Sequence, residues 1–120
     1  MSNSHNAFQT ERVGTTLVVL LQGDSLNTEE SALEREIDAL HAALDKSNVK
    51  NVLIDIGQAP FFGSIIIGAI VALCHKAVGG GGKAAMCAAS EGMFDVMKVM
   101  KLDQVFPYFE TREEALESFN

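Results

Sequence analysis

Residues 51–67 read NVLIDIGQAPFFGSIII, and this stretch decides the fold class of the chain. Asn51–Asp55 is a short, continuous apolar run ending in an acid, which predicts a strand buried on both faces of a sheet. Gly57–Pro60 predicts a loop, and Ser64 stands where a helix N-cap is expected before an unbroken apolar run. A buried strand followed by a helix is the unit from which parallel sheets with crossover helices are built.

The residues before Asn51 predict a hairpin and a helix. Two short runs, Phe8–Val13 and Thr15–Leu21, meet at Gly14, and the second is β-branched and aliphatic, as in a central strand. Thr28 is followed by two acids, which is typical of a helix start. The apolar residues that then recur at helical spacing are Leu33, Ile37, Leu40 and Leu44. We therefore expect two strands and then one helix with a core-facing stripe.

The residues after Ser64 continue the alternation of helix and strand. The helix that begins near Ser64 is expected to run to about Val78, because the glycine run Gly79–Gly82 cannot continue it. Lys83–Cys87 then predicts a short strand. This part of the chain therefore predicts a second helix and a fourth strand.

The C-terminal third predicts two more helices separated by a strand. Ser90 is placed to cap a helix whose apolar residues are Met93, Phe94, Met97 and Met100. Val105–Phe109 predicts a last strand, at a sheet edge because of its proline, and Thr111–Glu114 is a capping box that opens a final helix. The order ββαβαβαβα predicts an α/β fold: a sheet of mostly parallel strands with an initial antiparallel hairpin and about four helices.

Length and composition indicate one domain that binds neither nucleic acid nor membrane. The chain has 120 residues, of which 48% are hydrophobic, so we expect a disordered N-terminal tail at 1–7 and a single domain at 8–120. The net charge of −7 disfavours polyanions as partners. The N-terminus lacks a signal-peptide layout and the apolar runs are too short to span a bilayer, which predicts a cytoplasmic protein without membrane insertion.

Several motifs, in this order along the chain, carry a family resemblance. They are VLID at 52–55, FFGSIII at 61–67, the glycine run at 79–82, LDQVFP at 102–107 and EEAL at 113–116. Together they resemble STAS domains, the anti-sigma factor antagonist family, and so imply a STAS-like (SpoIIaa-like) fold. The resemblance implies a partner that is both an anti-sigma factor and a serine kinase. The unmodified antagonist would bind this partner, and phosphorylation of the motif serine would prevent binding.

Ser64 is the residue that matches the family's phosphorylated serine, although its neighbours depart from the motif. Gly63 replaces an acidic residue, and Ile65-Ile66 replaces the family's Ser/Thr-Gly. Two interpretations of Ser64 stay open: a helix N-cap worth about 1 kcal/mol, or a regulated serine at the same position. A phosphate at a helix N-terminus is compatible with the fold, so it would act by disturbing a partner's contact.

The helix after Ser64 is apolar on every side. We expect an inward stripe of Ile67, Ile70, Val71 and Cys74, which places Ile66, Ala69 and Ala72 towards the other side, with Ile65 near the start. Neighbouring helices could cover this second side. The alternative that we prefer is an exposed apolar patch for a partner or for a second copy of the chain in a homodimer. The predicted partner-binding residues are Gly63, Ser64, Ile65, Ile66 and Ala69.

The sequence favours a binding module over an enzyme. No cofactor, metal site or catalytic set is predicted, since the histidines lack metal-ligand spacing and Ser64 lacks a nucleophile elbow. Cys74 and Cys87 are too far apart for a CxxC motif, and we expect two buried, reduced thiols. The degraded motif around Ser64 also fits a second hypothesis, a non-phosphorylated STAS scaffold or accessory subunit of a transport or sensory complex.

Overall fold

The computed structural model describes residues 8–21, 30–46, 48–57 and 64–119. The elements are β1 (Phe8–Val13), β2 (Thr16–Leu21), α1 (Glu30–Leu44), β3 (Asn51–Asp55), α2 (Ser64–Gly79), β4 (Ala84–Cys87), α3 (Glu91–Val99), α4 (Leu102–Val105), β5 (Tyr108–Phe109) and α5 (Arg112–Ser118). The predicted tail at 1–7 and the predicted helix start at Thr28 lie outside the described residues.

The five strands form one sheet in the order β1-β2-β3-β4-β5. β1 and β2 pair antiparallel around Gly14, whose φ is +59°, and all other pairs are parallel. Every residue of β2, β3 and β4 is buried, which explains why their sequences are continuous apolar runs rather than alternating ones. The predicted α/β class, the hairpin and the parallel sheet are confirmed.

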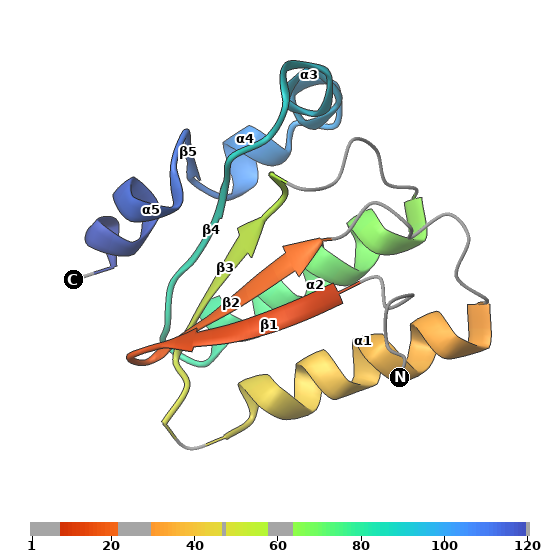
Figure 1. The fold of residues 1–120 in the computed structure, drawn as a ribbon, viewed down its shortest axis with the longest axis vertical. Helices are drawn as coiled ribbons and strands as arrows, with labels where there is room; N and C mark the ends of the chain where they lie inside the picture. The colour runs from red at the N-terminus through yellow and green to blue at the C-terminus, as the bar shows by residue number, and fades with distance from the viewer. Residues whose placement is uncertain (1–7, 22–29, 47, 58–63, 120) are drawn as a thin grey trace.

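Helices cover both faces of the sheet, and α2 passes behind the strands in Figure 1. One face packs against α1 to α4, in a core that includes Leu17, Val19, Ile54, Met86, Leu40, Ile70, Leu73, Met93, Met97 and Leu102. The other face packs against α5, in a smaller cluster of Val18, Leu20, Leu53, Ala85, Cys87 and Ala115. We call the second side of the sheet the α5 face. Within the described ranges no helix is long and apolar enough to cross a bilayer.

The predicted strand at Val105–Phe109 is wrong in its first half. Val105 ends α4, a short helix in addition to the four predicted. The backbone N–H of Phe106 donates to the carbonyl of Leu102 at 3.1 Å. Pro107 has no N–H to donate to a ladder, but its carbonyl accepts from Met86 at 3.0 Å, so pairing starts there. The strand is therefore only Tyr108–Phe109, and it lies at the sheet edge as predicted.

Two predicted helix caps are present in the structure. Ser90 Oγ accepts from the backbone N–H of Met93 at 3.2 Å, and Thr111 Oγ1 accepts from that of Glu114 at 3.1 Å. Each satisfies a donor that the first helical turn leaves without a partner. The caps fix where α3 and α5 begin, and α5 in turn determines which side chains reach the carboxyl end of β3.

Candidate functional site

The candidate site lies where β3 ends and α2 begins. β3 ends at Asp55 and α2 begins at Ser64, so the predicted helix start is confirmed. Gly63 and the side chains of Ser64 and Ile65 lie outside the described residues. The first turn of α2 contains no acidic residue. The positive end of the helix dipole is therefore not neutralised from within α2.

Ile66 does not face outward, so the outward position that we predicted for it is wrong, and its predicted role in partner binding loses the exposure on which it rested. Its side chain is 2% exposed and belongs to the core cluster beneath the sheet, together with the buried Ile70 and Leu73. The spacing of these residues is as helical as that of the inward stripe we predicted. On a helix that is apolar all round, two adjacent stripes can be buried, and spacing alone does not select between them.

The outer face of α2 consists of small residues. Gly68 and Ala72 are exposed, Ala69 is partly buried, and His75 is the first ionisable residue on this face. The ring of His75 packs edge-on against Phe106, with the ring centroids 5.1 Å apart. The outward position predicted for Ala72 is confirmed, and Ala69 lies at the margin of the exposed face.

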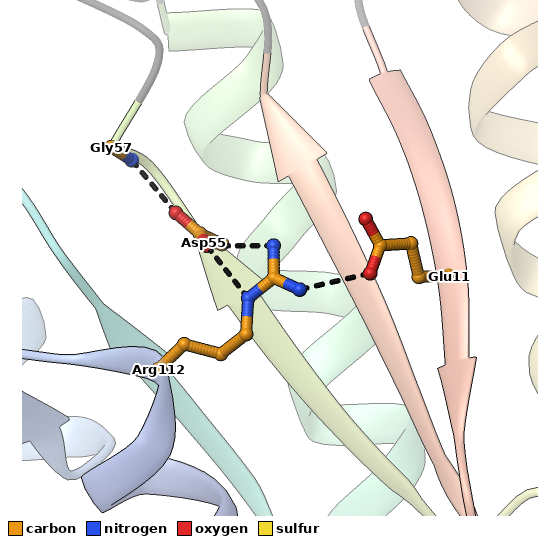
Figure 2. A network of polar contacts seen from close by, with 4 residues as sticks. All are labelled: Glu11, Asp55, Gly57 and Arg112. Atoms are coloured by element: carbon orange, nitrogen blue, oxygen red, sulfur yellow. Dashed lines mark hydrogen bonds and ion pairs between the residues drawn. The ribbon is translucent and has the colours of Figure 1, made fainter.

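Asp55 is held in a polar network that crosses the α5 face of the sheet. Figure 2 shows the Arg112 side chain reaching from α5 across β3 and β2 to Glu11 on β1. Arg112 donates from Nε to Asp55 Oδ2 at 3.1 Å and from Nη1 to Glu11 Oε1 at 2.9 Å, and its Nη2 lies 3.1 Å from Asp55 Oδ2. The other oxygen, Asp55 Oδ1, accepts from the backbone N–H of Gly57 at 2.9 Å. Asp55 therefore holds the backbone at Gly57, where the chain leaves β3 in the direction of Ser64.

Sequence reasoning missed Arg112 as part of this site. Burial of the guanidinium opposes its charge, but the hydrogen bonds that Arg112 donates to Glu11 and Asp55 outweigh that effect and raise the pKa of Arg112. A cation in the first turn of a helix is electrostatically disfavoured, so it needs a compensating partner. That unfavourable placement was the one local signal in the sequence that could have identified Arg112.

A groove of about 550 Å³ lies after β4, at the same carboxyl end of the parallel strands as Asp55. It is lined by Ala89, Glu91, Phe94, Tyr108 and Glu110. The Tyr108 hydroxyl accepts from the Ala89 backbone N–H at 2.9 Å, and burial raises the pKa of this phenol, which keeps it protonated. The preceding Ala88 adopts a left-handed conformation with φ of 68°. The groove offers aromatic and acidic surface for binding and no activated nucleophile.

The two cysteines are buried and free, as predicted. Burial raises the pKa of Cys74 to about 12. Burial, followed by the nearby charge of Asp55, raises the pKa of Cys87 to about 12 as well. Both thiols therefore stay neutral at physiological pH, where the thiolate needed for nucleophilic or redox chemistry is absent. Among the described residues, no group of three His, Cys, Asp or Glu side chains could hold a metal ion.

Comparisons with known proteins agree with this geometry. The family model of the STAS domain matches residues 7–115, whereas a search of curated proteins finds no match. The structure is similar to an anti-sigma-factor antagonist (STAS) domain protein from Planctomyces limnophilus, with a TM-score of 0.78 and 25% identity over 93% of this chain and 97% of that one.

Two further solved structures share the fold at lower identity. The Bacillus cell fate determinant SpoIIAA in its phosphorylated form has a TM-score of 0.72 and 21% identity, over 95% of this chain and 100% of that one. An anti-sigma factor antagonist from Mycobacterium paratuberculosis has a TM-score of 0.72 and 23% identity, over 99% and 98%. With the family model spanning nearly all of its length, this chain belongs to the STAS domain family.

Proposed function

We propose that this chain is an anti-sigma factor antagonist-like regulator that binds an anti-sigma factor/serine kinase in the cytoplasm. In this proposal, phosphorylation of Ser64 switches binding off. The observation that carries it is the position of Ser64 as the first residue of α2, in a chain of the STAS family. The proposed role is binding and not catalysis.

The start of α2 suits a reversible phosphate. A phosphoserine adds about 1.5 to 2 negative charges. Backbone N–H groups and the helix dipole at an N-terminus favour such charge, and α2 places no acid in its first turn to repel it. The modified domain would then stay folded. The added charge would act on the partner, whose docked surface would have to desolvate it.

The face of α2 that continues from Ser64 suits a docked protein. Gly68 and Ala72 are exposed and Ala69 is partly buried, so this face is uncharged and low in relief. We propose that Gly63, Ser64, Ile65 and Ala69 contact the partner. A second copy of this chain is the other occupant that we consider. Sedimentation of the free chain distinguishes them, because a dimer abolished by Ala72→Arg would assign the face to self-association.

Phosphorylation is tested by intact mass. Each serine kinase of the anti-sigma type from the host genome is incubated with the chain and ATP. We expect the mass of one phosphate to be added to the wild type by the cognate kinase and not to Ser64→Ala. Addition of phosphate to both proteins would place the modified residue elsewhere.

Partner binding is tested by titration of the same kinase with variants of matched charge. Ser64→Asp should weaken binding at least tenfold, because a charge would be buried at the centre of the contact. Ser90→Asp is the control, since it adds the same charge at the start of another helix, which Ser90 caps through its side chain, and aspartate caps equally well. Equal affinities of wild type and Ser64→Asp would contradict the switch.

A second candidate function is a scaffold or accessory subunit that is never phosphorylated. It is favoured by the departure from the family motif, with Gly63 before the serine and Ile65-Ile66 after it. This candidate predicts that no kinase adds phosphate, while the chain still binds a transport or sensory complex. The intact-mass experiment separates the two candidates.

A further inference from the structure

Basic residues gather at the end of the molecule opposite the start of α2. Five of the nine lysines and arginines lie in or beside the β1–β2 turn, the α1–β3 connection and the α2–β4 turn, which meet at the lower left of Figure 1. We call this set the basic pole. Its members are Arg12, Lys46, Lys50, Lys76 and Lys83.

Backbone contacts bring these segments together. The N–H of Lys50 donates to the carbonyl of Thr15 at 2.8 Å, and Arg12 Nη2 donates to the carbonyl of Asn48 at 3.4 Å. Both bonds join the β1–β2 hairpin to the connection that precedes β3. The basic side chains of these two segments therefore share one surface.

The α2–β4 turn joins the same surface. Gly82 lies so close to the Lys50 carbonyl that a Cβ on Gly82 would overlap it. Lys83, the next residue, is exposed. Lys76 Nζ, at the end of α2, pairs with Asp45 Oδ1 at 2.9 Å. In the described part of the chain, the other four cations of the basic pole form no ion pair.

A groove of about 310 Å³ runs through the basic pole. Its lining combines apolar and charged residues: Leu44, Val49 and Ala77 with Asp45, Lys46, Lys50 and Lys76, and Gly80. Leu44, Val49 and Ala77 are themselves buried members of the core. The groove thus has an apolar floor and a rim that is mainly cationic.

The negative ends of two helices offset only part of the positive charge of the basic pole. The C-termini of α1 and α2 both lie at the basic pole, and each contributes about −0.5 charge. Over the whole basic pole, Asp45 and the two helix ends amount to about −2 against five cations, so about +3 remains; Glu11, next to Arg12, is already paired with Arg112. A chain with a net charge of −7 therefore has a strongly asymmetric charge distribution. Such a distribution orients an acidic partner towards one end of the molecule.

We propose that the basic pole is a docking site for an acidic, amphipathic segment of a partner protein. Lysines on the rim fit carboxylates, and the apolar floor fits the intervening aliphatic side chains. Nucleic acids and anionic membranes are less suited, because an extended polyanion would also meet the acidic remainder of the surface. This interaction is separate from the proposed switch at Ser64 and does not depend on it.

The test uses the full chain and a fluorescein-labelled peptide of alternating Glu and Leu. A peptide with Gln in place of Glu is the neutral control. We expect saturable binding of the acidic peptide, measured by fluorescence polarisation, and its loss at about 0.3 M salt. Lys46→Gln/Lys50→Gln should weaken binding at least about fivefold.

The matched control is Lys98→Gln/Lys101→Gln, which removes two exposed lysines from α3 and its C-terminal end. It should weaken binding less than about twofold. Equal weakening by both pairs, or equal binding of the neutral peptide, would overturn the proposal. Tighter binding of duplex DNA or of phosphatidylserine vesicles, with the same dependence on Lys46 and Lys50, would also overturn it, because the partner would then be a polyanion.

Discussion

Removing the Arg112 guanidinium should destabilise the fold by about 2 kcal/mol. Arg112→Met keeps most of the aliphatic stem but deletes the contacts to Asp55 and Glu11. Exposed ion pairs contribute at most about 1 kcal/mol, whereas breaking a buried one costs about 3–5 kcal/mol. The Asp55 and Arg112 side chains are 12% and 26% exposed, so this network lies between the two cases.

Urea unfolding followed by circular dichroism measures this effect. Arg35→Met is the control, because Arg35 is exposed on α1 and should change the free energy of unfolding by less than about 0.5 kcal/mol. A double-mutant cycle with Asp55→Asn should give a coupling energy of more than about 1 kcal/mol, since the two side chains interact directly. If Arg112→Met were no more destabilising than Arg35→Met, our account of the α5 face would be refuted.

Three other stability predictions follow from local geometry. In urea unfolding, Gly82→Ala should lower the free energy of unfolding by more than about 2 kcal/mol, because the added Cβ would overlap a backbone carbonyl. Gly79→Ala, where the added Cβ meets open space, should leave that free energy unchanged or raise it slightly. Lys101→Gly should raise the melting temperature, because residue 101 is left-handed with φ of 62°, while Lys98→Gly within α3 should lower it. Burial raises the pKa of both thiols from 9.0 to about 12, so above pH 9 they ionise in the unfolded chain but not in the fold. The stability that is fully present below pH 9 is therefore lost as the pH approaches 12, by up to about 1.4 kcal/mol for each thiol and each pH unit. The wild type should therefore lose more stability than the double Cys→Ala variant between pH 9 and 11, and equal losses would contradict this reading of the thiols.

Most of the fold could be predicted because its signals are local. The hairpin at Gly14, the buried run of β3 and the serine and threonine caps each depend on a few neighbouring residues. The short helix α4 could not be predicted, because the Val105–Phe109 segment has strand propensity. Tertiary packing of Leu102 and Phe106 and the missing N–H of Pro107 decide its conformation.

The site was less predictable because its contacts are long-range. Asp55 and Arg112 are 57 residues apart, and periodicity gives no information on such a pair. The burial of Ile66 depends on how α2 is rotated against the sheet, which an all-apolar helix does not encode in its spacing. By contrast, the position of Ser64 at the start of α2 follows from the loop and the apolar run on either side of it.

The most direct test of our central claim is mass spectrometry of residue 64 in protein isolated from its own cells. We predict that Ser64 carries phosphate in one of two conditions, stress or rest, and is unmodified in the other. Complete coverage of the peptide containing Ser64 without phosphate in either condition would contradict the switch.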